Sequence, residues 1–132
     1  MKLDKNLFDE ASRSATASPR LRINHDLRNS SNDLSQRMLN AIEPGTILPI
    51  HRHPTTSETC IVLRGKAEEI FYDDNGNITE RVLMAPNSYC IGVNIEKGRW
   101  HKIVSLEPGT IIFEAKDGSY TPITPEDILE VV

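Results

Sequence analysis

The sequence holds little of several features that would mark its class. Only two cysteines, Cys60 and Cys90, occur in 132 residues. Both lie in apolar, strand-like surroundings without a Cys-x-x-Cys spacing, so no disulfide framework is implied. No apolar run approaches the roughly 18 residues that cross a bilayer, and the N-terminal region has no apolar run of the signal-peptide type. These absences predict a cytoplasmic protein that has no membrane partner.

A strong excess of one charge is also missing. The formal net charge is -4 and the sequence pI is about 5.5, with acidic and basic residues interspersed. Such a balance gives no electrostatic footprint for nucleic acid or for an anionic membrane. The sequence has no internal repeats and no low-complexity tracts. We therefore expect the partner to be a small molecule.

The length of 132 residues suits one domain with a single core. We divide residues 1–132 into an N-terminal helix and arm (1–35), a barrel core (36–115) and a C-terminal segment (116–132). Apolar residues recur at helical spacing near the start, and Asp4 can cap a helix that ends before Pro19. A helix over residues 4–17 is the only one that the pattern predicts.

Short alternating segments follow, separated by turns. The first begins at Arg20, and its alternation places Arg20, Arg22 and Asn24 on one face. Further strands are predicted over 38–42, 46–50, 59–64, 67–72, 78–84, 88–93, 100–105 and 110–115. The Asn75-Gly76 pair is a hairpin signal between two of them. The fold class is therefore mainly β, as a closed barrel or a two-sheet jelly roll.

The segment from Gly45 to Gly65 concentrates three side chains that bind metals. His51 and His53 are two residues apart, so an extended strand points both imidazoles to the same side. Glu58 follows a turn after this strand, and His101 is a fourth candidate. Three imidazoles and one carboxylate suit one divalent transition metal, whether iron, manganese, nickel, copper or zinc, and leave positions open for a ligand.

These residues resemble the two sequence motifs of the cupin superfamily. The first motif matches at Gly45, His51, His53, Glu58 and Gly65. The second, which ends in Pro-x-Gly-x-x-His, matches at Gly98 and His101 but has Glu96 in place of the proline. The resemblance implies a single cupin domain, a double-stranded β-helix or jelly-roll barrel, with one N-terminal α-helix. It also implies that His51, His53, Glu58 and His101 hold the metal.

Over nearly its whole length the chain resembles the WbuC family of cupin-fold metalloproteins. Three stretches carry the likeness: ASPRLRIN over 17–24, LNAIEPGT over 39–46 running into HRHP over 51–54, and FEAKDGSYTP over 113–122. This resemblance implies a link to surface polysaccharide, notably O-antigen (lipopolysaccharide) biosynthesis, and no particular reaction. Because cupin-like barrels often pair through an edge strand, we also expect a homodimer.

Four polar residues are candidates for binding a substrate. Arg20 and Arg22 on one strand face offer bidentate recognition of a phosphate or carboxylate, with Asn24 beside them. That pattern suits a sugar phosphate or a nucleotide sugar. The alternative is that these arginines pair with Glu114 or Asp117 and fasten the N-terminal arm. Lys116 invites the same question, and the alternative there is a solvated side chain.

Two classes of function follow from this site. One is a metal-dependent enzyme of the isomerase or epimerase type, acting on a small anionic sugar derivative; the other is a non-catalytic binding or regulatory module. An Fe(II)-dependent oxygenase is a third possibility. A positioned proton-transfer group would favour an enzyme. The candidates are Glu69 and Tyr72, which strand parity places on opposite faces, and for both we expect surface exposure.

Overall fold

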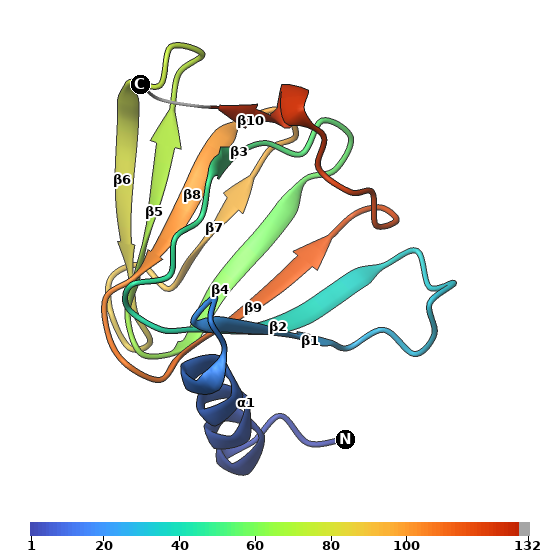
Figure 1. The fold of residues 1–132 in the computed structure, drawn as a ribbon, viewed down its shortest axis with the longest axis vertical. Helices are drawn as coiled ribbons and strands as arrows, with labels where there is room; N and C mark the ends of the chain where they lie inside the picture. Colours follow the sequence, from blue (N-terminus) through green and yellow to red (C-terminus); the bar gives the residue numbers. More distant parts are fainter. Residues whose placement is uncertain (130–132) are drawn as a thin grey trace.

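Two antiparallel sheets of five strands each face one another in the computed structural model, which describes residues 1–129 (Figure 1). In spatial order, the first sheet contains β1 (Arg22–Asp26), β2 (Gln36–Ile42), β9 (Thr110–Lys116), β4 (Glu58–Arg64) and β7 (Gly92–Ile95). The second contains β10 (Ile128–Leu129), β3 (Ile50–His51), β8 (Trp100–Ser105), β5 (Ala67–Tyr72) and β6 (Ile78–Met84). The mainly β fold is confirmed.

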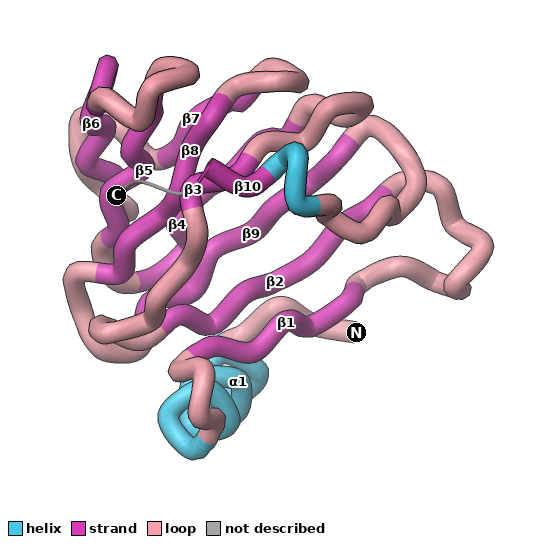
Figure 2. Tube along the Cα trace, turned by 45° about the horizontal axis from the view of Figure 1, so that its top comes forward, coloured by secondary structure: helices cyan, strands magenta, loops and turns pink. Residues whose placement is uncertain are grey.

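Helix α1 (Lys5–Ala17) lies against the outer face of the first sheet, below β1 and β2 in Figure 2. The Asp4 side chain accepts a hydrogen bond from the backbone N–H of Leu7 at 3.0 Å, which caps the helix as predicted. Ala11 and Ala15 are buried and form a cluster with residues of β2 and β9. Such small side chains let the helix backbone approach the sheet closely. Within the described residues, no helix is long and apolar enough to span a bilayer.

The main core lies between the sheets. It is built from buried apolar side chains on both inner faces: Ile42, Cys60, Val62, Ala67, Met84, Ile103 and Ile112. These residues alternate with side chains that point outward, as a two-layer sheet structure requires. Trp100 and Tyr72 belong to a separate cluster with Ile50 and Ile70. Since Tyr72 has the opposite strand parity to Ala67, this cluster covers the outer face of the second sheet.

Three predicted strands were partly wrong. The strand predicted from Arg20 begins at Arg22, because the chain turns at Leu21, which has a φ of 55°. Of residues 46–50 only Ile50 lies in a strand, because Pro49 has no N–H to donate to a neighbour. Of residues 88–93 only the last two belong to β7. A turn occupies the start of that segment, where the backbone N–H of Ala85 donates to Cys90 O at 3.1 Å and Asn87 has a φ of 56°. Apolar alternation alone did not reveal these turns.

The C-terminal segment returns to the second sheet. After β9 the chain forms a short 3₁₀ helix, Pro125–Asp127, and then β10, which pairs with β3 at Ile128 and His51. Arg52 fixes this arrangement, because its Nε donates to Asp127 Oδ1 at 2.9 Å and its guanidinium stacks 4.3 Å from the centre of the Trp100 ring. Residues 130–132 of the predicted segment 116–132 lie outside the described residues.

Candidate metal centre and its cavity

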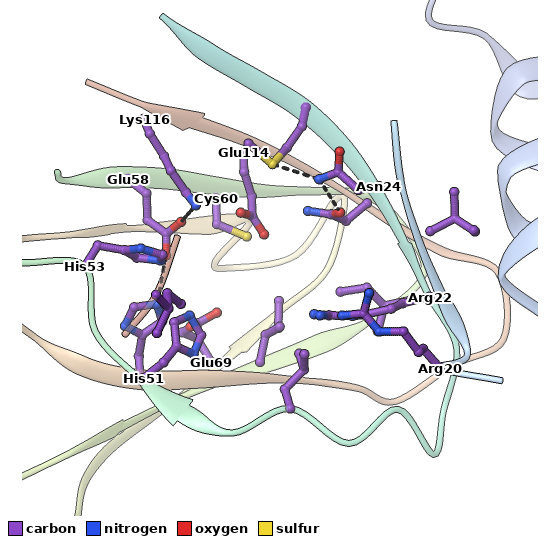
Figure 3. A pocket seen from close by; sticks show the side chains of 18 of the residues that line it. Arg20, Arg22, Asn24, His51, His53, Glu58, Cys60, Glu69, Glu114 and Lys116 are labelled. Atoms are coloured by element: carbon purple, nitrogen blue, oxygen red, sulfur yellow. Dashed lines mark hydrogen bonds and ion pairs between the residues drawn. The ribbon is translucent and has the colours of Figure 1, made fainter. Parts of the chain in front are cut away.

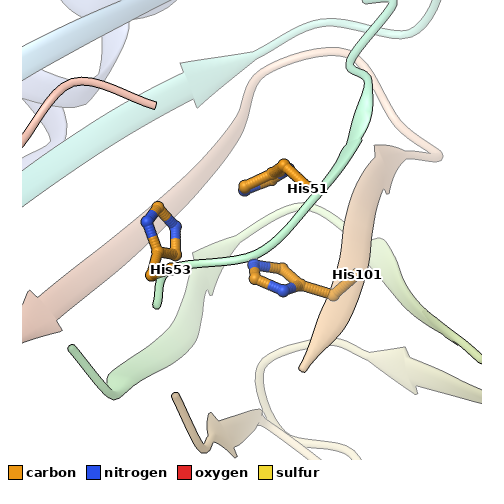
Figure 4. A group of neighbouring side chains, drawn as sticks. All are labelled: His51, His53 and His101. Atoms are coloured by element: carbon orange, nitrogen blue, oxygen red, sulfur yellow. The ribbon is translucent and has the colours of Figure 1, made fainter. Parts of the chain in front are cut away.

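Strand pairing brings the three predicted histidines together. His51 on β3 and His101 on β8 are direct register partners, and their ring centroids are 4.4 Å apart. His53 follows two residues after His51 and turns its ring toward the same point, as Figure 4 shows. One nitrogen from each ring lies within 4.8 Å of the others. Residues 50 positions apart in the sequence thus form one cluster of metal-binding nitrogens.

Backbone carbonyls fix the orientation of two of these rings. The Nδ1 atom of His51 lies 3.0 Å from Pro49 O, and Nδ1 of His101 lies 2.8 Å from Arg99 O. A carbonyl oxygen only accepts, so each Nδ1 carries the proton and donates. In the neutral ring, the Nε2 lone pair is then left to face the cluster, which is the arrangement found around metal-bound histidines.

Glu58 completes the cluster from the facing sheet. Its Oε1 lies 2.8 Å from His101 Nε2 and 3.8 Å from His53 Nε2. His101 Nε2 is fully buried, yet among the described residues it has no partner with hydrogen-bond alignment. Two atoms bound to one ion at about 2.0–2.2 Å stand about 3 Å apart. The short, misaligned contact therefore fits two ligands of one metal ion.

The local electrostatics suit a cation at this point. Burial is the largest cause that lowers the pKa of His51 and of His53 to about 4, so both rings are neutral at pH 7. For Glu58, burial favours the protonated form, but the neighbouring His101 outweighs it and lowers the pKa to about 2. The pKa of His101 is raised, because the Glu58 carboxylate outweighs the effect of burial. Two neutral donors and an anion thus face the centre of the cluster.

A cavity of about 360 Å³ extends from this cluster between the two sheets. Figure 3 shows the histidines at one end and Arg20 and Arg22 at the other. Glu69, which lies beside His51 in the figure, and Glu114 come from opposite walls. A volume of this size is within the range of small-molecule sites. The cavity therefore has a metal-binding end, carboxyl groups on both walls and a basic end.

All four predicted substrate-binding residues line this cavity: Arg20, Arg22, Asn24 and Lys116. Among residues 1–129, neither arginine forms an ion pair. The alternative pairing with Glu114 or Asp117 is therefore wrong, and Asp117 Oδ1 instead accepts the backbone N–H of Ser57 at 2.8 Å. Asn24 Nδ2 donates to Asn40 Oδ1 at 3.0 Å. The two guanidinium groups are left available to a ligand.

Lys116 lies near the metal-binding end of the cavity. Its Nζ is 3.9 Å from Glu58 Oε2, and only 14% of its side chain is exposed. The alternative of a freely solvated lysine is therefore wrong. The reason is that Lys116 is the last residue of β9, where its parity, the same as that of Glu114, turns it toward the interior. Its ammonium group stabilises the ionised form of Glu58.

The expectation that Glu69 and Tyr72 are exposed was wrong for both. Glu69 is only 2% exposed and faces the cavity, because β5 lies inside the second sheet between β8 and β6. Tyr72 packs on the opposite face with Trp100, away from the metal cluster. Burial is the main cause that raises the pKa of Glu69 to about 8. Glu69 is thus a buried carboxyl at the candidate site, and Tyr72 is not part of it.

Glu114 was not recognised as a site residue from the sequence. It lies on β9 between Met38 of β2 and Cys60 of β4, and its side chain lines the cavity. Burial is the main cause that raises its pKa to about 7. The sequence signal was that Glu114 and Lys116 share strand parity and so point to the same side of β9. Only the arrangement of both sheets shows that this side faces the cavity.

Several solved structures share this two-sheet fold. The solved structures that resemble the chain include CapF, a capsular polysaccharide assembling protein from Staphylococcus aureus, with a TM-score of 0.67 and 21% identity over 83% of this chain. An oxalate oxidase in complex with the substrate analogue glycolate gives a TM-score of 0.66 and 17% identity over 83% of the chain. KdgF from Halomonas sp. gives 0.62 and 14% over 78%. These likenesses show the fold.

The shares of the other chains differ. The chain spans 30% of CapF, 57% of the oxalate oxidase and 84% of KdgF. Residues 3–84 match a family model, and the chain belongs to this family, which is described as Domain of unknown function (DUF6016). No curated protein matches the sequence significantly. The resemblance to the WbuC family stays a prediction.

Proposed function

We propose that the chain is a metal-dependent cupin enzyme that acts on a small, anionic, sugar-derived substrate. The observation that carries the proposal is the order of groups along one cavity. A cluster that fits a cation lies at one end, two unpaired guanidinium groups lie at the other, and carboxyl groups line both walls. A sugar phosphate or nucleotide sugar has hydroxyl oxygens at one end and an anionic group at the other, which matches this order.

The metal would be held by His51, His53, His101 and Glu58. When bound, a divalent transition metal supplies a Lewis acid that polarises neighbouring carbonyl or hydroxyl oxygens. His51 and His101 keep their ring orientations without it, because their Nδ1–H groups already donate to backbone carbonyls. This mixed nitrogen and oxygen set accepts iron, manganese, nickel, copper or zinc.

Arg20 and Arg22 would bind the anionic group of the ligand. Each guanidinium presents donors in a planar fork that matches two oxygens of a phosphate or carboxylate. Asn24 is already hydrogen-bonded to Asn40, and this places a polar surface next to the arginines. Lys116 would add positive charge near the metal-binding end, where it faces Glu58.

Buried carboxyl groups favour an enzyme over a binding module. A cavity lined only by apolar groups around the metal would serve binding alone. Here Glu69 is almost fully buried without a hydrogen bond or ion pair to any described residue. Burying an unpaired carboxyl destabilises the fold, so such a group is expected where proton transfer needs it. The pKa of Glu69, raised to about 8, suits a group that exchanges protons near neutral pH.

The pathway is proposed from two likenesses. The sequence resembles the WbuC family, which is linked to O-antigen, and the solved structures with the same fold include a capsular polysaccharide assembling protein. Both concern surface polysaccharide. We therefore place the substrate among the phosphorylated or nucleotide-linked sugars from which such polymers are built.

Metal content and ligand binding test the proposal together. Protein purified without an affinity tag is analysed for metals, and its melting temperature is then measured with sugar phosphates and nucleotide sugars, with and without the metal. We expect one metal per chain and a rise in melting temperature that requires both metal and anionic group. A protein that holds no metal, or that no compound stabilises, would contradict the proposal. Oxygen uptake by the Fe(II)-loaded protein would instead identify an oxygenase.

A further inference from the structure

Two carboxyl groups face each other across the cavity. Glu69 points inward from β5 of the second sheet, and Glu114 points inward from β9 of the first sheet (Figure 3). Both line the same cavity. Glu69 lies two residues from Phe71, the register partner of His101, and Glu114 lies two residues from Lys116, the register partner of Glu58. A ligand bound next to the metal cluster would therefore have one carboxyl group on each wall.

Glu69 has no structural role that explains its burial, whereas Glu114 is half-buried and its ionised form is favoured by the Lys116 ammonium and the Asn40 amide. Glu69 lies beside Ile103 on one neighbouring strand and Val82 on the other, and Glu114 lies beside Met38 and Cys60. These neighbours are uncharged. Among residues 1–129 neither glutamate takes part in an ion pair, whereas the buried Glu58 contacts three cationic or titratable groups. An unpaired buried carboxyl such as that of Glu69 costs stability, which points to a function.

We infer that Glu69 and Glu114 form a two-sided proton-transfer pair, and that the substrate is a sugar derivative whose configuration is inverted at the carbon next to a carbonyl group. This inference rests on the proposed function and specifies its reaction. One carboxylate on one wall removes the proton from one face of that carbon. The carboxylic acid on the other wall donates a proton to the opposite face.

The reaction is balanced without a redox partner. As the C–H bond breaks, its electron pair forms a carbon–carbon double bond and the carbonyl oxygen gains the negative charge. As the new C–H bond forms on the other face, the carbonyl is restored. One glutamate has gained a proton and the other has lost one, and solvent exchange through the cavity mouth restores both.

The pair needs one protonated and one ionised member at working pH. The pKa values of Glu69 and Glu114 are raised to about 8 and about 7, mainly by burial. The charge of Glu114 also raises the pKa of Glu69, so ionisation of one carboxyl favours protonation of the other. These pKa shifts agree with the positions of Glu69 and Glu114 on opposite walls of the cavity.

Inversion in D₂O tests the pair. The metal-loaded protein is incubated with epimeric pairs of aldose phosphates, glucose with mannose and ribose with arabinose, and NMR follows inversion and deuterium at the carbon next to the carbonyl. We expect the newly formed epimer to carry deuterium while the recovered starting epimer keeps its proton. Glu69→Gln and Glu114→Gln should each slow inversion by at least about 100-fold.

Two readouts separate a catalytic role from a structural one. Each variant keeps one carboxylate, which can still exchange the proton on one face of the carbon with solvent. Each variant should therefore exchange the proton of one epimer only, and the two variants should differ in which epimer that is. Binding of a phosphorylated arabinonohydroxamate, a planar mimic of the reaction intermediate, is measured by calorimetry and should persist in both variants together with the metal content. The control is Glu68→Gln, which lies on the same strand with the opposite parity and pairs with Arg81.

The outcomes distinguish this inference from the proposed function. Inversion that survives in either variant, or ligand binding without any inversion, overturns the two-sided pair and leaves a metal-dependent binding site. Failure of the wild-type protein to hold the metal or bind any of these phosphates removes the proposed function, and the inference with it. Loss of inversion in both variants, with metal and hydroxamate still bound, supports the pair.

Discussion

His101 Nε2 and Glu58 Oε1 lie 2.8 Å apart, but the two groups are not aligned for a hydrogen bond. The two residues come from different sheets, on β8 and β4. An ion between them would satisfy both atoms at once. This contact is therefore the most direct structural indication of where a metal would lie.

Removing one ligand should release the metal. In His101→Ala or Glu58→Gln, we expect the metal affinity to fall by more than about 100-fold. Removing only a hydrogen-bond partner of a ligand costs up to about 100-fold in affinity, and removing the ligand itself should cost more. Calorimetric titration of the metal-free protein measures this. His25→Ala is the matched control, since His25 lies on β1 outside the cluster and should leave the affinity unchanged. Unchanged affinity in both cluster variants would rule out this metal site.

The buried Glu69 should make stability depend on pH. Its pKa is raised from 4.5 to about 8 by burial and by the charges of Glu58 and Glu114, against the opposing effect of His101. Between these values the folded state binds the proton and the unfolded state does not. The free energy of unfolding therefore falls as pH rises from about 4.5 to about 8.

Glu69→Gln removes this effect. The stability of the variant relative to wild type should rise across that pH window by an amount on the order of a few kcal/mol, and should be constant below and above it. Urea unfolding of the metal-free proteins at a series of pH values measures the difference. A difference that does not change with pH would show that Glu69 is not buried as described.

Ligand binding should depend on the arginines at the far end of the cavity. Replacing Arg22 or Arg20 with alanine removes charge-assisted hydrogen bonds to the anionic group, so we expect the Kd for a stabilising sugar phosphate to rise about 10- to 100-fold. The corresponding neutral sugar should bind equally to variant and wild type. Arg13→Ala serves as the control, because Arg13 lies on α1 and does not line this cavity. Equal losses for neutral and phosphorylated sugars would argue against anion recognition.

Gly65 and Gly98 should differ in their tolerance of alanine. Both have positive φ, 86° at Gly65 and 84° at Gly98. A Cβ at Gly65 would lie 2.7 Å from Thr110 Cα, whereas one at Gly98 would meet nothing within 4 Å. Gly65→Ala should lower the free energy of unfolding by about 3 kcal/mol or more, and Gly98→Ala by only about 1–2 kcal/mol. Equal losses in urea unfolding would mean that the Thr110 contact has no effect.

Local patterns predicted most of the strands. Ala67–Tyr72, Ile78–Met84 and Trp100–Ser105 end where the alternation and turn signals placed them. The hairpin between the first two follows from Asn75-Gly76, whose preference for a tight turn is a local property. The failures, over 20–21, 46–50 and 88–93, concern segments in which turns interrupt an apolar pattern. Such turns depend on contacts that the pattern does not contain.

The composition of the cavity was harder to predict than its metal-binding end. The histidines could be grouped because His51 and His53 share a strand side and His101 completes a known spacing. Glu69 and Glu114 belong to facing sheets, and strand parity alone says only which face a residue occupies. Whether that face meets solvent or a cavity is decided by the neighbouring strands. A glutamate is usually exposed, so its burial became evident only from the assembled sheets.

The two-residue strand that bears His51 is held between β8 on one side and β10 on the other. Residues that flank the first motif's histidines are thus joined to residues 128 and 129. During synthesis on the ribosome, His51, His53 and Glu58 emerge long before β10. The fully braced metal site should therefore form only after β10 has emerged, so that an ion captured by a shorter nascent chain would be held more loosely.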